Sequence, residues 1–472
     1  MNPLEKNDYG SSCLSDLPDF KYDHQKMLKK ISKFFKHASS KIMAEPNIIG
    51  PNSHSLSPQK ISSGAIKIVE KLQINGYESY LVGGCVRDLL MNIKPKDFDV
   101  ATNATPEQVK ELFNRSRIIG RRFQIVHVRA GSEIIEVTTF RAQHTDKKNG
   151  PNKSQRSAKG MLLRDNIFGS VEEDAIRRDF TMNALYYCPK KNSISDYADG
   201  LVDIKDRIIR IIGEPSQRYR EDPVRILRAI RFSAKLGFSI ETSSSIAINK
   251  SRLLLADISP ARLFDEVLKL FMNGYALRTF NALREYGIFE ILFPATEKAL
   301  INDSTYYLQF IEQALINTDK RIRKRQRVTP AFLFAALLWP ALKEKEKKSL
   351  QPKKISSFSL HADAEKLIAS QCKILAIPRR FSLPMREIWE LQLRLPRRAG
   401  NQAFKILENK RFRAGYDFLL LREDSGEIKS DLGPWWTIFQ DVDEPTQRKM
   451  VNKIEMSRQK TTKQISSKIT HE

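Results

Sequence analysis

A glycine pair followed by two aspartates could carry out phosphoryl-transfer chemistry. Asp97 comes thirteen residues after Gly84, the second residue of a Gly83-Gly84 pair, and Asp99 lies two residues further on. A glycine turn at a helix start presents backbone N–H groups to phosphate, helped by the helix dipole. On a strand, side chains at i and i+2 share one face, so the two carboxylates would stand together. Such a pair can hold Mg²⁺, which completes its coordination with water and substrate phosphate in nucleotidyl transfer.

The order of these features is more specific than an aspartate pair alone. The chain has a second Asp-x-Asp, at Asp441 and Asp443, with no glycine turn before it, and we interpret that copy as a solvated loop. The first pair follows an apolar strand signal at residues 80–82, then Gly-Gly and Arg-Asp. We therefore expect a nucleotidyl-transfer site there, with a plain turn and charged edge strand as the alternative.

The elements that must position this site have an α/β pattern over residues 61–210. Periodicity, β-branched runs and a Thr-Pro helix start predict an order of helices and strands. Helices are expected at 62–74 and 105–113, and strands at 79–82, 97–101, 125–129 and 134–140. In the last strand Glu136 is either a third carboxylate beside the aspartates or a solvent-facing residue. The polar stretch 143–159 predicts a mobile loop, either a lid over the substrate or a loop without a role.

A helical pattern after residue 218 separates an apolar face from a polar one. At 100° per residue, Val224, Leu227, Ile230 and Ala234 fall in one wedge, and Asp222, Arg225 and Arg228 fall in the opposite one. The polar wedge is either an exposed charged face or a surface that reads a base. An Arg donor beside an Asp acceptor can distinguish the Watson–Crick edge of adenine from those of guanine and uracil.

These motifs resemble the class II nucleotidyltransferases, which include tRNA CCA-adding enzymes and bacterial poly(A) polymerases. The likeness starts with Leu-Val-Gly-Gly-Cys-Val-Arg-Asp-Leu-Leu (81–90) and Lys-Asp-Phe-Asp-Val (96–100), and it runs from about residue 60 to 440. Cys85 stands where many relatives have a third glycine. Other blocks in the family order are 173–185, 196–200 and 220–229, and the segments 120–123, 161–169 and 327–333 are closest to the bacterial poly(A) polymerases.

The resemblance implies roles for individual residues. Asp97, Asp99 and Asp179 would be catalytic, although an ion pair of Asp179 with Arg177 or Arg178 is an alternative. Asp222 and Arg225 would read the incoming base, with Arg228 nearby. The nucleotide would also meet Gly83, Gly84, Arg87, Asp88 and Arg141, and the metal ions would meet Asp97, Asp99 and, from its strand position, Glu136.

Composition indicates a polyanionic partner. The 472 residues include 80 Lys+Arg against 55 Asp+Glu, a net charge of +25, and nucleic acid is the expected partner rather than a merely solvated basic surface. Four cysteines without C-x-x-C spacing indicate a reducing cytoplasm. The strongest apolar run, 330–340, is too short to span a bilayer, so no transmembrane segment is expected.

The chain divides into five regions by composition and periodicity. We expect a mostly disordered basic extension (1–60) with an amphipathic segment at 24–36, an α/β nucleotidyltransferase head (61–210), a helical neck that reads the base (211–275), a helical body and tail that bind RNA (276–440), and a disordered basic tail (441–472). Basic residues near aromatics suit a single-stranded 3′ end, with solvated helix ends as the alternative. The candidates are Arg321, Arg323, Lys324, Arg325, Arg394, Arg397 and Arg398.

For the fold, the resemblance implies a nucleotidyltransferase head like that of polymerase β, a mixed sheet with helices, followed by an all-α neck, body and tail. The resemblance implies template-independent transfer of AMP from ATP to RNA 3′ ends by two Mg²⁺ ions. CCA addition to tRNA uses the same head and stays an alternative, as does a noncatalytic RNA-binding protein. We expect a monomer acting in RNA 3′ processing and decay, with RNA decay proteins as candidate partners.

Overall fold

A computed structural model describes residues 45–120, 124–142, 167–302, 304–348 and 357–469. Residues from Pro46 onward form one compact unit. The segment 24–36 and the loop 143–159 lie outside the described residues. No helix in the described ranges combines the length and apolar character needed to cross a membrane.

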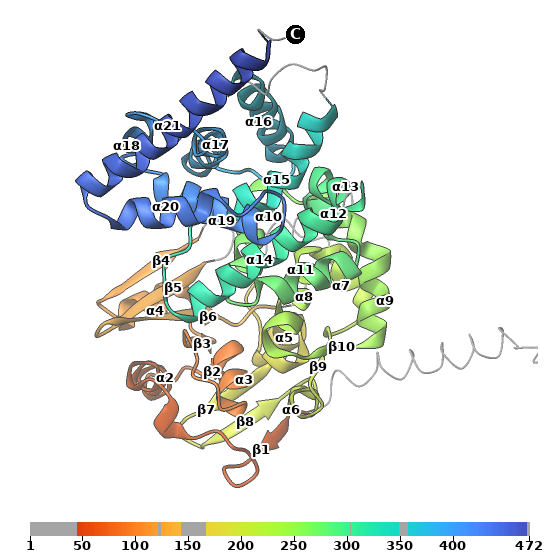
Figure 1. Ribbon diagram of the computed structural model, residues 1–472. Coiled ribbons are helices and arrows are strands. Elements are labelled where there is room, and N and C mark those ends of the chain that lie inside the picture. The colour runs from red at the N-terminus through yellow and green to blue at the C-terminus, as the bar shows by residue number, and fades with distance from the viewer. Residues whose placement is uncertain (1–44, 121–123, 143–166, 303, 349–356, 470–472) are drawn as a thin grey trace, which may run out of the picture. The chain divides into compact units, whose positions relative to one another are not determined.

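The head is built on an eight-stranded mixed sheet, as predicted. Its strand order is β1-β8-β7-β2-β3-β6-β5-β4, with β3 and β6 parallel and the other neighbours antiparallel (Figure 1). The strands are β1 (Asn47–Ile49), β2 (Ser79–Val82), β3 (Asp99–Thr102), β4 (Ser116–Ile119), β5 (Ile125–Ala130), β6 (Glu133–Thr139), β7 (Leu185–Cys188) and β8 (Ser193–Asp196).

Helices cover one face of this sheet. Val100 and Val137, on neighbouring strands, are buried in the same apolar cluster as residues of α2 (Ser63–Ile74), α3 (Gly84–Leu90) and α4 (Pro106–Leu112). Side chains alternate between the faces of a strand, so Asp99 and Glu136 leave the sheet on the opposite face. The head also contains η1 (Pro58–Lys60), α5 (Val171–Arg177), η2 (Thr181–Asn183) and α6 (Gly200–Lys205).

The prediction that Asp97 lies on a strand is wrong. β3 begins at Asp99, and Asp97 occupies an exposed bend just before it. The reason lies in the partner strand, because the ladder between β2 and β3 ends at the pair Val82–Asp99. At Gly83 the chain turns with φ +73°, so β2 cannot continue opposite Asp97.

After β9 (Ile208–Ile209) the described chain is mainly helical, and its one further strand, β10 (Ser239–Ile240), pairs with β9. The predicted apolar wedge of α8 (Val224–Leu236) is confirmed, since all four of its residues are buried. The remaining helices are α7 (Pro215–Glu221), α9 (Thr242–Ser251), η3 (Arg252–Asp257), α10 (Pro260–Phe271), α11 (Ala276–Glu285), α12 (Phe289–Leu292), α13 (Pro294–Asn302), α14 (Ser304–Arg323), α15 (Pro330–Lys348), α16 (Ser357–Cys372), α17 (Arg379–Arg394), α18 (Gln402–Leu407), α19 (Phe412–Asp424) and α20 (Leu432–Asp441).

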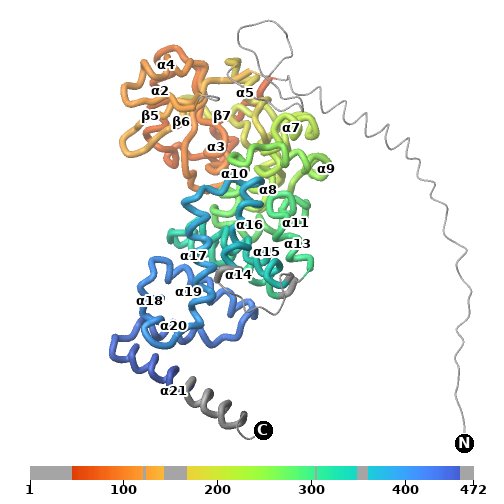
Figure 2. Tube along the Cα trace, turned by 90° about the horizontal axis from the view of Figure 1, so that it is seen from above, coloured from red at the N-terminus to blue at the C-terminus, as the bar shows by residue number. Residues whose placement is uncertain are grey.

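Four of these helices lie side by side in both views, namely α14, α15, α17 and α19 (Figures 1 and 2). The predicted disorder of residues 441–472 differs from the structure, which contains α21 (Glu444–Ile469). Two local contacts account for its first turns. Arg448 pairs with Glu444 one turn earlier at 2.5 Å, and Val451 is buried against the cluster that contains Phe439.

Candidate active site

Four polar residues form a row across adjacent strands of the head. Register pairs Asp99 with Glu136, Glu136 with His127, and His127 with Arg117. Register partners project from the same face of a sheet. The His127 Nε2 atom lies 3.4 Å from a Glu136 carboxylate oxygen. Of the two readings of Glu136, this register favours a carboxylate beside Asp99, although its side chain stays 47% exposed.

The environment of Asp99 disfavours its negative charge. Burial raises the pKa of the Asp99 carboxyl to about 6, and the charge of Glu136 adds to the rise. Arg178 opposes this effect, and Asp97 strengthens it slightly. A divalent cation would relieve the repulsion among these carboxylates. Their oxygen donors fit Mg²⁺, which uses one or two protein carboxylates and otherwise takes water and phosphate oxygens.

The described residues contain no group of three or more His, Cys, Asp or Glu side chains that could hold a metal ion. Asp97 explains part of this, since its side chain is 69% exposed and its nearest charged partner is Lys96 at 3.8 Å. An ion at Asp99 would therefore need further ligands from water or from a substrate phosphate.

The glycine turn lies next to Asp99. Gly83 has φ +73°, which favours glycine, and it precedes the first residue of α3. A Cβ atom at Gly83 would lie 3.2 Å from the Arg178 guanidinium, whereas one at Gly84 would meet only ordinary contacts. Cys85 fits in place of a third glycine because its buried thiol donates to the Val82 carbonyl. Burial raises the pKa of this thiol to about 12, so it stays protonated.

Arg87 and Asp88 are buried in this conformation. Their side chains are 3% and 8% exposed, and they bond to each other. Arg87 also donates to the Asn183 side chain at 2.6 Å, and Lys235 of α8 lies 3.6 Å from the Asp88 carboxylate. Both side chains thus connect α3 to η2 and α8, and their contact with the nucleotide stays a prediction.

Asp179 forms an ion pair, but with neither arginine proposed from sequence. Its carboxylate lies 2.5 Å from Arg228 Nη2 and accepts hydrogen bonds from Asn183 and from the Phe180 N–H. Burial alone would raise the pKa of the Asp179 carboxyl, but Arg228 and these hydrogen bonds lower it to about 2. The contact therefore joins the segment between α5 and η2 to α8.

Arg178 is bound instead by Asp174, a residue that the sequence analysis did not single out. The Asp174 carboxylate accepts from Arg178 at 3.1 Å, from the Tyr186 hydroxyl at 2.6 Å and from the Arg141 backbone N–H at 3.2 Å. Asp174 lies in the family block 173–185, and this position could have identified it as a candidate from sequence. The Arg141 guanidinium donates to the Gln124 carbonyl at 3.5 Å.

The proposed base-reading residues have separate partners. Asp222 lies before α8, not on it, and pairs with Arg262 at 2.9 Å. Arg225 is 12% exposed and donates to the Arg218 carbonyl, with Glu221 at 3.4 Å. The contact of Arg225 with Glu221 could have been predicted from sequence, because the two residues are four positions apart. No sequence pattern indicated the contact of Asp222 with Arg262.

Of the RNA-contact candidates, two line a cavity of about 840 Å³ in the helical region, namely Arg321 and Lys324. Arg323 and Arg325 are exposed beside it but do not line it. Arg394 and Arg397 are exposed, and Arg398 lies 3.6 Å from Asp431. Their contact with RNA stays a prediction.

Family comparisons match three segments of the chain. Residues 79–210 match the "Poly A polymerase head domain", residues 237–300 the "Probable RNA and SrmB- binding site of polymerase A", and residues 354–468 the "Polymerase A arginine-rich C-terminus".

Similar proteins give the same grouping. Poly(A) polymerase I of Escherichia coli is 48% identical over 413 residues, covering 86% of this chain and 89% of that protein. The Haemophilus influenzae enzyme is 46% identical over 404 residues, covering 84% and 88%. A CCA-adding enzyme of Lactobacillus delbrueckii is 37% identical over 231 residues, covering 49% and 56%. The crystal structure of the Bacillus stearothermophilus CCA-adding enzyme in complex with CTP superimposes with a TM-score of 0.53 at 25% identity, covering 83% of each chain.

Proposed function

This chain belongs to the poly(A) polymerase family of nucleotidyltransferases, and we propose that it adds AMP residues from ATP to RNA 3′ ends without a template. The sequence similarity to poly(A) polymerase I extends over 86% of the chain, whereas the sequence similarity to the CCA-adding enzyme of Lactobacillus delbrueckii covers 49%. The similarity to poly(A) polymerase I thus includes most of the helical region as well as the head. Poly(A) addition is therefore the better supported reaction. The proposal places it in RNA 3′ processing and decay in the cytoplasm.

One observation carries the proposed site, namely the shared face of Asp99 and Glu136 with the raised pKa of Asp99. We propose that Asp97 and Asp99 hold two Mg²⁺ ions, with Glu136 beside them. When bound, the ions supply Lewis-acid stabilisation of the 3′-oxygen and of the leaving pyrophosphate.

The protein groups around this site have separate tasks. The turn at Gly83 would let the triphosphate approach the Arg178 guanidinium, because Gly83 has no Cβ atom, which would lie 3.2 Å from that group. Arg178, fixed by Asp174, places a positive charge beside Asp99. The division into a head (61–210), a base-reading neck (211–275) and an RNA-binding body (276–440) remains part of the proposal.

Base selection is assigned to Asp222 and Arg225. Both now bond to protein groups, so adenine would replace one of these partners when it binds. Arg225 would donate to the acceptor of the adenine edge, and Asp222 would accept from its amino group. Arg228 and Arg225 both lie on α8. The ion pair of Arg228 with Asp179 would therefore hold α8, and with it Arg225, in position.

The test is extension of a short RNA primer with Mg²⁺ and each nucleoside triphosphate separately, beside a tRNA that lacks its CCA end. Long products with ATP alone, absent for Asp99→Asn, support the proposal. CTP incorporation confined to the tRNA would show CCA addition, the second candidate. No incorporation on either RNA by the wild-type protein contradicts both.

A further inference from the structure

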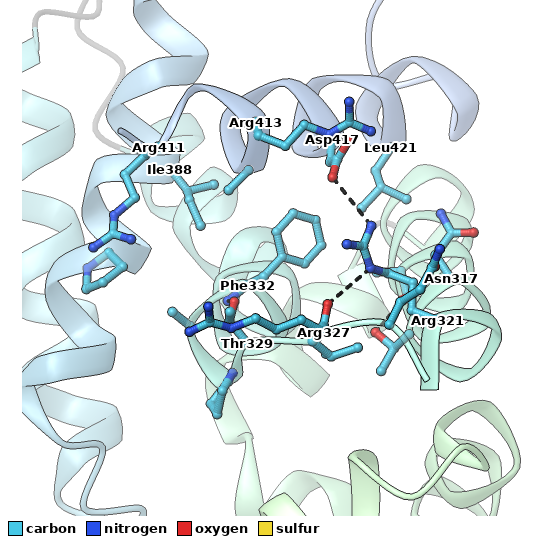
Figure 3. Close-up of a pocket in the computed structure, with 18 of the residues that line it drawn as sticks. Asn317, Arg321, Arg327, Thr329, Phe332, Ile388, Arg411, Arg413, Asp417 and Leu421 are labelled. Atoms are coloured by element: carbon cyan, nitrogen blue, oxygen red, sulfur yellow. Dashed lines mark hydrogen bonds and ion pairs between the residues drawn. The ribbon is translucent and has the colours of Figure 1, made fainter. Parts of the chain in front are cut away.

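A basic cavity of about 840 Å³ lies among α14, α15, α17 and α19 (Figure 3). Pockets of about 300–1,000 Å³ enclose ligands the size of a nucleotide. The part of the wall formed by residues 314–332 lies between the matched family segments, and none of the lining residues falls in residues 237–300, the segment described as a probable RNA-binding site. The cavity is therefore separate from the described RNA-binding segment.

The wall carries eight cationic side chains and two carboxylates. Asp417 is shared by two of the cations, at 3.7 Å from Arg321 and 3.0 Å from Arg413. Arg411 is held at 2.6 Å by Glu387, outside the lining. These ion pairs orient the guanidinium groups but leave positive charge in excess. The eight cations are Lys320, Arg321, Lys324, Arg327, Arg380, Lys410, Arg411 and Arg413.

The floor of the cavity is apolar and aromatic. Figure 3 shows Phe332 in the middle of the lining residues, between Arg411 and Arg321. Its ring is only partly buried, and the partly buried Phe381 also lines the cavity. Phe381 is stacked on Phe264 and covered by Arg380, whereas Phe332 meets Phe418 in a T-shaped contact. Phe332 therefore provides a stacking surface for a base, and the surrounding cations provide donors for phosphates.

We propose that this cavity binds single-stranded RNA upstream of the 3′ end that is being extended. This inference rests on the proposed function and adds a second point of contact with the substrate. A base stacks on Phe332, and phosphates lie against the exposed cations Lys324 and Arg327, for which the described residues provide no ion-pair partner. The aromatic floor favours a base-bearing polyanion over an acidic peptide.

The binding test uses fluorescein-labelled A15 RNA and the full-length protein, with fluorescence anisotropy at several salt concentrations. The double variant Lys324→Gln/Arg327→Gln is expected to bind about tenfold more weakly. Its slope of log affinity against log salt should be less negative by about 1.4, since a single strand gives about 0.7 per phosphate contact. Phe332→Leu should bind about five- to tenfold more weakly with an unchanged slope.

The matched control is Lys190→Gln/Lys191→Gln, which removes the same charge from an exposed turn between β7 and β8. The inference requires that this variant keep wild-type affinity and slope. Equal losses in both charge variants would indicate a nonspecific charge effect and overturn it. Thermal melting of each variant separates lost binding from lost folding.

Two further measurements distinguish RNA binding in the cavity from mononucleotide binding there and from a failure of the proposed function. If the charge variant loses binding of labelled ATP but not of A15, the cavity is a mononucleotide site and the inference is wrong. If wild-type protein does not extend A15 with ATP, the proposed function is contradicted. The anisotropy measurements still test whether the cavity binds RNA. Unchanged A15 affinity in the cavity variants overturns the inference alone.

Discussion

Asp99 and Glu136 are register partners on the adjacent parallel strands β3 and β6, so their carboxylates leave one face of the sheet together. Burial and this neighbour raise the pKa of the Asp99 carboxyl to about 6. The folded protein therefore holds an unfavourable charge at neutral pH. A charge that destabilises the folded state in this way is typical of a functional site.

Asp99→Asn should remove most activity while it stabilises the fold. The raised pKa means that the folded state binds the proton more tightly than the unfolded state, whose aspartate titrates near 3.8. The free energy of unfolding contributed by this group is highest below pH 4 and is lost as the pH rises through about 6. At pH 8 the variant should be more stable by on the order of 1 to 3 kcal/mol, and at pH 4 the two should be similar.

Urea denaturation at pH 4 and pH 8 measures this difference, with Asp441→Asn in the second Asp-x-Asp as the control. Mg²⁺ should raise the melting temperature of wild-type protein at pH 8 more than that of Asp99→Asn. Activity should fall at least about a hundredfold, since several kcal/mol of charge stabilisation are removed. A variant that is less stable than wild type at pH 8 would contradict the account of Asp99.

Asp179→Asn should act mainly on stability. Because the pKa of this carboxyl is lowered to about 2, its ion pair stabilises the fold above about pH 4 and is lost as the pH falls through 2. We expect a loss of about 1 to 2 kcal/mol at pH 7, reduced by the partial exposure of Arg228.

A double-mutant cycle with Arg228→Gln tests this role by urea denaturation. The double variant should be little less stable than either single one, since both remove the same contact. Additive losses would show that Asp179 and Arg228 do not stabilise each other. If Asp179→Asn retains wild-type stability yet loses turnover, the residue is catalytic instead.

Sequence patterns with a local physical cause were predictable. The glycine turn follows from a conformation that favours glycine, and the buried face of α8 follows from helical periodicity. Both depend on residues within a few positions of one another. The α/β order of the head was likewise predicted from strand, helix and turn signals, whereas its mixed sheet was implied by the family resemblance.

Contacts between distant segments were not predictable in this way. Asp179 of the head pairs with Arg228 of α8, and Asp222 pairs with Arg262 of α10, forty residues further along the chain. The start of β3 also depends on where its partner β2 turns away, so Asp97 fell off the expected strand. The helix α21 has weak periodicity of its own and depends on packing of Val451.

Asp222→Asn should weaken the preference for ATP. The amide keeps one oxygen, which can still accept from the Val224 N–H at 3.2 Å, but it loses the second acceptor that faces Arg262. Loss of one such hydrogen bond costs about 1 to 3 kcal/mol. The ratio of kcat/KM for ATP to that for GTP should therefore fall roughly tenfold or more. An unchanged ratio would remove Asp222 from base selection, and Arg262→Gln serves to separate loss of positioning from loss of the acceptor.

Gly83→Ala and Gly84→Ala form a matched pair that tests the turn. At Gly83 the backbone has φ +73° and ψ −133°, a region nearly restricted to glycine, and a Cβ atom would lie 3.2 Å from Arg178. Gly83→Ala should therefore lose about 1 to 3 kcal/mol of unfolding free energy. Gly84 is the first residue of α3 and has ordinary space for a Cβ atom, so Gly84→Ala should keep or slightly raise stability, by up to about 1 kcal/mol.

If the triphosphate lies on this turn, Gly84→Ala should nonetheless raise KM for ATP, because the added methyl group occupies the approach of the phosphates. Urea denaturation and ATP kinetics on both variants check the pair, and equal stability of the two would contradict the strained turn.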